Sequence, residues 1–320
     1  MTKLMHGDCL ELLKTMESES IQTCITSPPY WGLRDYGNDN QIGLEKTPEA
    51  YVEKMVSVFQ EIKRVLKEDG TVWLNLGDSY MSSGGASRHH GYTDPKYSNG
   101  RKIEHFEPQA YPHDIIKPKD IVGIPWRVAL ALQSDGWYLR QDIIWAKGNP
   151  MPESVKDRCT KSHEYLFLLT KNKKYYFDYE AIKETSVDYE ASYKRYESGF
   201  GGKKNQSLKE SGYGQTKVIG RRKFDGKRNK RSVWNVNTQP CKEAHFAVMP
   251  QKLVKPCVLA GSRKGDKILD PFAGAGTVGM VASRHERDFI GIELNAEYIE
   301  IAEKRIASAE QAPKQMELAV

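Results

Sequence analysis

Short apolar runs alternate with amphipathic segments along most of this chain, and this alternation limits the possible folds more than any other feature. Runs rich in β-branched and aromatic residues predict strands, and the segments between them predict crossover helices. Strands that alternate with helices are typical of a parallel sheet covered on both faces. We therefore expect an α/β fold with a doubly wound, mostly parallel, Rossmann-like sheet. The expected strands cover residues 3–7, 21–26, 70–76, 137–147, 164–171, 266–270 and 288–294.

The clearest expected helix follows the second strand. Its apolar face is formed by Val52, Met55, Val56, Phe59, Ile62 and Leu66. Gly70 is expected to end this helix, because glycine readily adopts the left-handed conformation of a helix C-terminus. Two further crossover helices are expected at residues 277–287 and 295–306.

At 320 residues the chain is long enough for one large α/β domain and a smaller module. The net charge is +6, and the basic excess is concentrated in residues 189–231, where tyrosines and phenylalanines are interspersed. Lysine and arginine neutralise phosphates, so this segment predicts DNA binding; a solvated insert is the alternative. The candidate DNA-contacting residues are Arg195, Lys203, Lys204, Arg221, Arg222, Lys223, Arg228 and Arg231.

Several classes of protein are disfavoured by what the sequence lacks. The cysteines show no CxxC spacing, which argues against a zinc site or a disulfide framework. No apolar run reaches the roughly 18 residues of a membrane span, and no signal peptide opens the chain. Residues 82–118 contain irregularly spaced histidines, which we interpret as a loop near a site. We expect a cytoplasmic protein with reduced thiols and no bound metal.

The segment ILDPFAGAGTVGM, residues 268–280, reads as a strand, a turn containing Gly274 and Gly276, and a helix. Glycines let the backbone approach a ligand closely, and the helix N-terminus offers unpaired N–H donors. The turn is not a P-loop, because no GK[ST] ends it, and it does not match GxGxxG. It predicts a cofactor site of another kind.

Two carboxylates indicate which cofactor this turn binds. Glu293 ends the next strand about twenty residues on, where an acidic side chain accepts hydrogen bonds from ribose hydroxyls. Asp270 lies directly before the turn and could bind an ammonium group. This pair suits S-adenosylmethionine better than NAD, so we expect a methyl donor; taken singly, each residue could be a helix cap or a solvated strand end.

The tetrad Ser27, Pro28, Pro29 and Tyr30 follows an expected buried strand. It resembles the catalytic motif [DNS]PP[YFW] of DNA amino-methyltransferases, and this resemblance implies that the substrate is an exocyclic amine. An exocyclic amine is a poor nucleophile, because its lone pair is delocalised into the aromatic base, and a site must hold both hydrogens as the nitrogen becomes tetrahedral. The Ser27 hydroxyl and the Pro28 carbonyl could be these acceptors, with Pro29 fixing the backbone. Tyr30 could stack on a base rotated out of the duplex. An ordinary proline-containing turn is the alternative.

SPPY, together with DPFAGAGT and IGIELN, resembles the DNA amino-methyltransferases, in which [DNS]PP[YFW] is the catalytic motif. The order of motifs resembles the permuted β-group of that family, and HGDCLELL resembles its element that contacts the cofactor adenine. The resemblance implies S-adenosylmethionine as cofactor. The implied cofactor-binding residues are Asp8, Asp270, Pro271, Phe272, Gly274, Gly276, Thr277, Glu293 and Asn295.

The resemblance also implies a domain plan and a reaction. Residues 1–183 would be the catalytic half with a loop insertion at 82–118, residues 184–240 the target-recognition region, and residues 241–320 the cofactor-binding half. The serine of the tetrad resembles the N4-cytosine branch, and N6-adenine methylation is the alternative. An inactive nucleic-acid-binding protein and a nicotinamide dehydrogenase are alternatives from other classes.

The expected partner is double-stranded DNA, and a cognate restriction endonuclease is a candidate partner. The chain would act as a monomer or a homodimer. The family is expected in the cytoplasm of bacteria, where its members also act when a phage encodes them.

Overall fold

The computed structural model describes residues 1–33, 41–81, 113, 115–186, 226–240 and 248–311. The chain divides into two compact units. The larger unit comprises Met1–Asp178 and Ser232–Val320, and the smaller comprises Tyr179–Arg231. The described part of the smaller unit contains a two-stranded antiparallel pair, β6 (Glu184–Thr185) and β7 (Lys227–Arg228).

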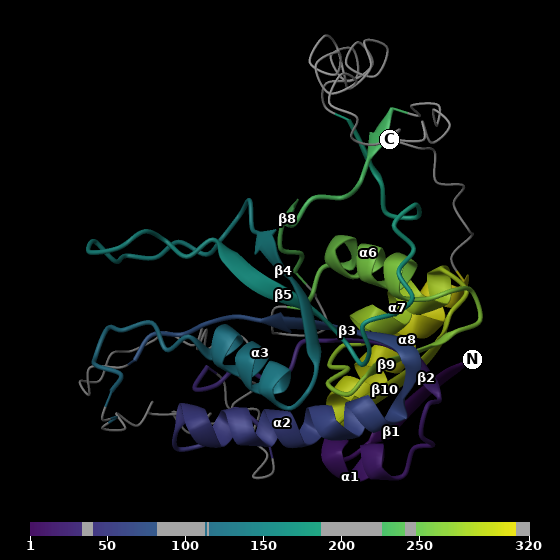
Figure 1. The fold of residues 1–320 in the computed structure, drawn as a ribbon, viewed down its shortest axis with the longest axis horizontal. Helices are drawn as coiled ribbons and strands as arrows, with labels where there is room; N and C mark the ends of the chain where they lie inside the picture. Colours follow the sequence, from purple (N-terminus) through teal and green to yellow (C-terminus); the bar gives the residue numbers. More distant parts are fainter. Residues whose placement is uncertain (34–40, 82–112, 114, 187–225, 241–247, 312–320) are drawn as a thin grey trace, which may run out of the picture. The chain divides into compact units, whose positions relative to one another are not determined.

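The larger unit contains an eight-stranded sheet in the order β1-β10-β9-β2-β3-β5-β4-β8 (Figure 1). The strands are β1 (Thr2–His6), β2 (Ile21–Thr26), β3 (Leu66–Leu76), β4 (Tyr138–Ala146), β5 (His163–Thr170), β8 (Val233–Asn235), β9 (Lys267–Asp270) and β10 (Asp288–Glu293). All neighbours pair in parallel except β5, which is antiparallel to both β3 and β4. The predicted α/β fold with a mostly parallel sheet is confirmed.

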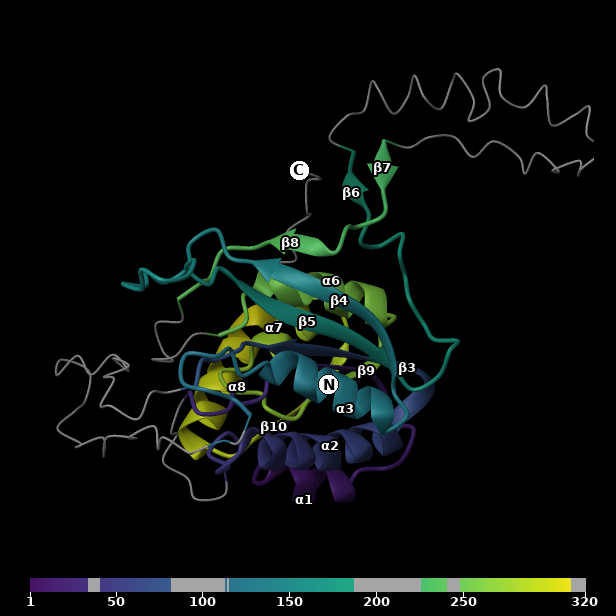
Figure 2. The same cartoon turned by 60° about the vertical axis from the view of Figure 1, so that its left-hand side comes forward.

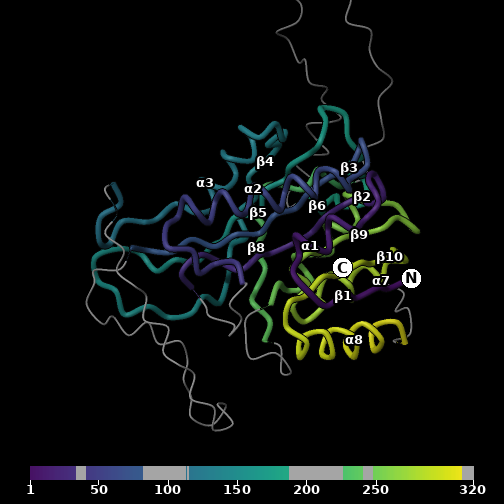
Figure 3. Tube along the Cα trace, turned by 90° about the horizontal axis from the view of Figure 1, so that it is seen from below, coloured from purple at the N-terminus to yellow at the C-terminus, as the bar shows by residue number. Residues whose placement is uncertain are grey.

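Helices cover both faces of this sheet (Figures 1 and 3). The helices are α1 (Cys9–Lys14), α2 (Pro48–Val65), α3 (Ile124–Ser134), α6 (Gln251–Gly261), α7 (Thr277–Arg284) and α8 (Ala296–Gln311). On one face α2 contacts both α1 and α3, and on the other face α7 contacts both α6 and α8. Along β3, Val72 and Leu74 belong to the core beneath α2, whereas Trp73 points to Gly261 of α6. This period of two shows that both faces of a central strand are buried.

The expected end of the long helix at Gly70 is wrong. α2 ends at Val65, because Leu66 is already extended, with φ −71° and ψ 140°, and opens β3. The register between β2 and β3 shifts just here: Ile21 is paired with Leu66 and Thr23 with Thr71. A Cβ at Gly70 would lie 2.9 Å from the Lys67 carbonyl oxygen. Gly70 therefore permits a strand irregularity instead of ending a helix.

α3 and β8 are among the elements that were not expected from the sequence. α3 is apolar around much of its circumference, so it lacks the one-sided pattern that predicts a helix. β8 has only three residues, and it pairs with β4 at the edge of the sheet, as Figure 2 shows. Because Val233–Asn235 joins the main sheet, the compact smaller unit ends at Arg231, whereas the expected target-recognition region extends to residue 240. No helix in the described part of the chain is long and apolar enough to span a membrane.

Candidate active site

The sequence motifs meet at the carboxyl edge of the sheet. β2, β9 and β10 run parallel to one another, so Thr26, Asp270 and Glu293 end their strands at the same edge. Ligands of open α/β sheets bind at this edge. The hydroxyl of Thr26 donates a hydrogen bond of 2.7 Å to Asp270 Oδ1 and so joins two segments 244 positions apart in the chain. Thr26 directly precedes the tetrad, and Asp270 directly precedes the glycine turn.

Asp270 is the most deeply buried carboxyl group of this edge, with 2% of its surface exposed. Its Oδ1 atom also accepts a hydrogen bond of 3.1 Å from the Phe272 amide. Burial raises the pKa of Asp270 to about 7 and the charge of Glu293 adds to this, whereas the hydrogen bonds from Thr26 and Phe272 oppose it. Burial therefore favours the protonated form of Asp270 more than in an exposed aspartate.

Glu293 fixes the backbone of the glycine turn. Its two carboxylate oxygens accept hydrogen bonds from the amides of Gly274 (2.8 Å) and Asn295 (2.9 Å). Burial raises the pKa of Glu293 above its usual range. Asn295 in turn accepts a hydrogen bond from the Glu297 amide at the start of α8. Each carboxylate oxygen can accept more than one hydrogen bond, so sugar hydroxyls could still bind Glu293.

Asp8 lies beside the end of β10, because the Gly7 amide donates a 3.0 Å hydrogen bond to the Glu293 carbonyl oxygen. The side chain of Asp8 caps α1 by accepting a hydrogen bond of 3.0 Å from the Glu11 amide. Asp8 therefore has a structural function that does not depend on a ligand. Its contact with the cofactor stays a prediction.

The glycine turn suits a ligand that carries polar groups. Gly274 and Gly276 have φ values of +48° and +74°, which disfavour other residues, and Gly276 directly precedes α7. Within the described part of the chain, Thr277 Oγ1 is buried without a hydrogen-bond partner. Such an orphaned hydroxyl at a helix N-terminus fits a carboxylate ligand. These features match the amino-acid end of S-adenosylmethionine, while Pro271 is buried and Phe272 packs against the core.

The tetrad follows β2 without interruption. Pro28 is buried, whereas Ser27 and Pro29 are partly exposed. The hydroxyl of Tyr51 on α2 donates a 2.9 Å hydrogen bond to the Pro29 carbonyl oxygen, which fixes the backbone of the two prolines. Two hydrogen bonds therefore hold the tetrad in place. One runs from Tyr51 to Pro29, and the other runs from Thr26, the residue before the tetrad, to Asp270.

Tyr30 is part of a hydrogen-bonded cluster. Its hydroxyl donates to Glu164 Oε2 at 2.7 Å and accepts from Ser27 Oγ at 3.3 Å. Asn75 Nδ2 donates to the same Glu164 oxygen at 3.1 Å, and Lys147 pairs with the other carboxylate oxygen. Burial, and then the charge of Glu164, raise the pKa of Tyr30 well above its usual range. The tyrosine therefore stays protonated at neutral pH, and its function as a stacking platform stays a prediction.

Sequence reasoning missed Thr26, Asn75, Lys147 and Glu164. A signal existed for two of them. Asn75 interrupts the apolar run TVWLNL, and Glu164 opens the apolar run EYLFLLT. Polar residues at strand ends on the ligand-binding edge are candidates for a functional site.

Most of the predicted DNA-contacting residues lie outside the described residues: Arg195, Lys203, Lys204, Arg221, Arg222 and Lys223. Arg228 and Arg231 are described, and both donate to Glu184 Oε1, at 3.0 and 2.8 Å. Their contact with DNA stays a prediction, as does the function of residues 82–118. No group of three or more potential metal ligands occurs in the described ranges.

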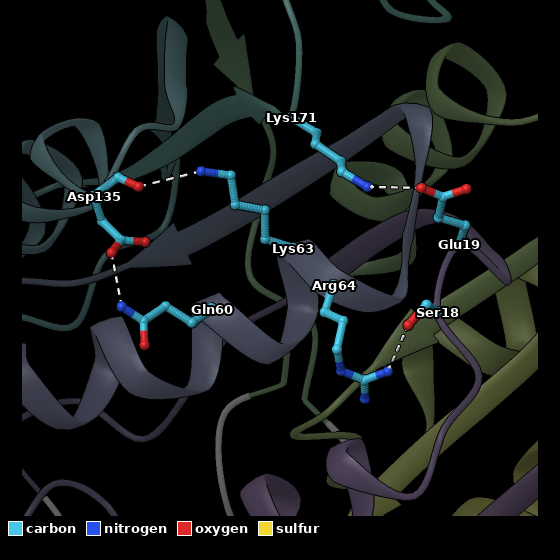
Figure 4. A pocket seen from close by; sticks show the side chains of 7 residues that line it. All are labelled: Ser18, Glu19, Gln60, Lys63, Arg64, Asp135 and Lys171. Carbon is cyan, nitrogen blue, oxygen red and sulfur yellow. Dashed lines mark hydrogen bonds and ion pairs between the residues drawn. The ribbon is translucent and has the colours of Figure 1, made fainter.

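One cavity of about 550 Å³ lies away from these motifs (Figure 4). It is lined by Ser18, Glu19, Gln60, Lys63, Arg64, Asp135 and Lys171. Ser18 and Glu19 precede β2, so the cavity lies near the amino ends of the parallel strands, opposite the site. Its charged side chains interact with protein groups: Lys171 with Glu19 at 3.5 Å, for example, and Lys63 with the Asp135 carbonyl at 3.2 Å. We do not assign a ligand to it.

Comparison with known proteins agrees with this geometry. The chain is 46% identical over 303 residues to the type II methyltransferase M.Cfr9I of Citrobacter freundii, covering 95% of this chain and 87% of the relative. It is 46% identical over 304 residues to M.SmaI of Serratia marcescens, covering 95% and 90%.

Solved structures show the same fold at low identity. PvuII DNA methyltransferase, described as cytosine-N4-specific, matches with a TM-score of 0.61 and 19% identity over 97% of this chain and 91% of the other. A DNA modification methylase of Thermus thermophilus, solved with S-adenosylmethionine, matches with a TM-score of 0.57 and 20% identity over 98% and 97%.

The family model for DNA methylases of the N6/N4 type matches residues 21–304, which include both the tetrad and the glycine turn. This match and the 46% identity to type II methyltransferases confirm the resemblance predicted from the motifs. The chain therefore belongs to the DNA methylase family, whose methyl donor is S-adenosylmethionine.

Proposed function

We propose that this protein methylates the exocyclic N4 amine of cytosine within a specific sequence of double-stranded DNA. The observation that carries the proposal is the position of Ser27. Ser27 directly follows Thr26, the last residue of β2. Thr26 donates a hydrogen bond to Asp270, which directly precedes the glycine turn. In this proposal, the amine acceptor and the methyl-donor site would lie at one edge of the sheet.

The protein's contribution to the reaction is to orient the amine. S-adenosylmethionine supplies the methyl group when bound. Ser27 Oγ and the Pro28 carbonyl oxygen would accept the two N–H groups of the amine, which stabilises the nitrogen as positive charge develops on it. A direct displacement of this kind needs no covalent bond to the protein. The base must leave the helical stack to reach the site, because its amine is otherwise inaccessible.

The hydrogen bond between Thr26 and Asp270 supports the required alignment. Displacement needs the amine and the methyl carbon held close together and in line. A 2.7 Å bond between two buried side chains allows little relative movement of the segments that would hold them. The choice of cytosine over adenine depends on the serine of the tetrad, and the similarly folded PvuII enzyme is described as cytosine-N4-specific.

The proposal is tested by the product. DNA of varied sequence is incubated with the protein and S-adenosylmethionine, digested to nucleosides and analysed by mass spectrometry. We expect N4-methylcytosine, and a product containing only N6-methyladenine would refute the cytosine assignment. Sequencing of the modified DNA would then identify the recognised sequence.

Ser27→Ala should lower the turnover about 10²- to 10³-fold, because one of two preorganised acceptors is removed. Cofactor affinity, measured by calorimetry, should change little. Ser20→Ala is the matched control, since the Ser20 hydroxyl donates a hydrogen bond of 2.8 Å to the nearby Glu17 carbonyl oxygen, before β2 begins. Equal loss of turnover and of cofactor binding in Ser27→Ala would show that Ser27 is structural.

A further inference from the structure

The short hydrogen bonds around Tyr30 are directed toward Glu164. Lys147 and the Asn75 amide group are donors, so they require Glu164 to be the acceptor. The Tyr30 hydroxyl has two acceptors within reach, Glu164 Oε2 at 2.7 Å and Asn75 Oδ1 at 3.3 Å, and its single proton is donated to the nearer one, Glu164. Its oxygen is then free to accept the Ser27 proton at 3.3 Å. The chain of hydrogen bonds therefore runs from Ser27 through Tyr30 to Glu164.

This direction has a consequence for Ser27. Because its proton points to Tyr30, its lone pairs point elsewhere and can accept a hydrogen bond from an amine. Without Glu164, the Tyr30 proton would have Asn75 Oδ1 and Ser27 Oγ as acceptors, both at 3.3 Å. Whenever it turned toward Ser27, the serine would present a donor to the substrate. A donor at this position would oppose the positive charge that develops on the amine nitrogen.

The cluster is also shielded from solvent. Asn75 is 1% exposed, and the side chains of Glu164 and Lys147 are 13% and 20% exposed. A proton released at Ser27 can therefore be carried away through hydrogen-bonded protein groups. Lys147 balances the charge of Glu164, which stabilises this partly buried carboxylate.

We propose that Ser27, Tyr30 and Glu164 form a proton path along which the methylated amine loses its proton, with Glu164 as the final acceptor. The proposal rests on the proposed placement of the target amine against Ser27, and it holds for cytosine or adenine. Glu164 and Tyr30 act through Ser27, so they are positioning residues and proton carriers that do not themselves contact the amine.

Methyl transfer and proton transfer balance in this path. The amine nitrogen forms a bond to the methyl carbon as the carbon–sulfur bond breaks, and the sulfonium becomes a neutral thioether. The nitrogen, now positively charged, loses one proton to Ser27 Oγ. Ser27 passes its own proton to Tyr30 Oη, and Tyr30 passes its proton to Glu164 Oε2. The products are a neutral methylamino group and a neutral Glu164 carboxyl group, which later releases the proton to solvent.

The test uses Tyr30→Phe, which keeps the ring and removes only the hydroxyl, and Glu164→Gln, which keeps the shape and removes the charge. Single-turnover rates on the methylatable DNA would be measured in H₂O and D₂O. Tyr138→Phe and Glu53→Gln are matched controls on an exposed strand position and on α2. Thermal melting and cofactor calorimetry establish that each variant is folded.

We expect both variants to lose about 10²-fold or more in single-turnover rate, with the KM for DNA nearly unchanged, because a positioned proton acceptor contributes this much. The parent should react more slowly in D₂O than in H₂O, and this solvent isotope effect should be absent in both variants. The double variant should be no slower than either single variant, since one broken link already interrupts the path. Fluorescence of a 2-aminopurine at the target base should show unchanged base rotation.

Rates for Tyr30→Phe and Glu164→Gln within about twofold of the parent would overturn the proton path while leaving the proposed function intact. Losses that simply add in the double variant would also overturn it, because they indicate two independent packing defects. The proposed function fails separately, if the parent protein produces no methylated exocyclic amine.

Discussion

At the scale of single residues, the chemistry of Asp270 depends strongly on its surroundings. It accepts hydrogen bonds from Thr26 and Phe272, yet burial raises its pKa to about 7. A carboxyl group with a higher pKa in the folded protein than in the unfolded chain holds extra protons only when folded. The stability that comes from these protons is present at low pH and is lost as the pH rises through about 7.

This linkage gives a pH prediction. Between pH 6 and pH 8 the free energy of unfolding of the free protein should fall by about 1 kcal/mol more than that of Asp270→Asn. Denaturant titrations at both pH values measure the difference. Parallel pH profiles for the two proteins would show that Asp270 is already ionised at pH 6.

The same residue gives a binding prediction. If the Asp270 carboxylate binds the ammonium group of S-adenosylmethionine, the affinity of the parent should increase from pH 6 to pH 8. Asp270→Ala should weaken cofactor binding with DNA affinity less affected. Calorimetry for the cofactor and fluorescence anisotropy for DNA separate the two effects, and the opposite pattern would count against the assignment.

At the scale of elements, the close packing of α7 holds the glycine turn in place. A Cβ at Gly276 would lie 2.8 Å from the Cβ of Ala302 on α8. A Cβ at Gly279 would lie 2.5 Å from Ile306 Cδ1 and 2.7 Å from the Phe289 ring on β10. Glycine within a helix is normally unfavourable, so its presence here indicates that a larger side chain would not fit between α7 and the neighbouring α8 and β10.

Gly279→Ala should therefore destabilise the protein by about 1–3 kcal/mol, although alanine favours helices, because the added methyl group overpacks the interface. Thermal or denaturant unfolding measures this loss. The double variant Gly279→Ala with Ile306→Val removes the clashing Cδ1 atom and should recover part of the stability. Ile306→Val alone is the control, and a stabilised Gly279→Ala would contradict the packing argument.

At the scale of the whole molecule, the smaller compact unit, Tyr179–Arg231, contains the basic segment. If its cations bind phosphates, changing Arg221, Arg222 and Lys223 to glutamine should weaken DNA binding. The slope of log affinity against log salt concentration should decrease by about 0.9 for each phosphate that is no longer neutralised. Cofactor affinity should be unchanged, because the glycine turn belongs to the larger unit.

The matched control changes three exposed lysines of the larger unit, Lys14, Lys264 and Lys304, to glutamine. This control has the same change in net charge. A similar loss of affinity in both variants would indicate a nonspecific effect of charge, and the basic segment would then have no special role in DNA binding.

Much of the fold was predictable because its signals are local. Strand and helix periods are properties of neighbouring residues, and the runs that predicted β2, β5 and β10 are strands in the structure. Gly70 was misinterpreted because a glycine near the end of a helix can either end that helix or permit an irregularity in the strand that follows. The irregularity between β2 and β3 is visible only when the two strands are paired. The three residues of β8 are too few for a periodic signal.

The sequence by itself determined the family, the glycine turn and the tetrad, because each depends on the type and spacing of residues within a short segment. Only the tertiary structure decided which distant groups meet them. β5 is antiparallel to β3, so the first residues of β5 lie at the edge where β2 and β3 end. This antiparallel direction of β5 brings Glu164 to Tyr30. If β5 were parallel to β3, Lys171, at the other end of the same apolar run, would lie at this edge of the sheet instead.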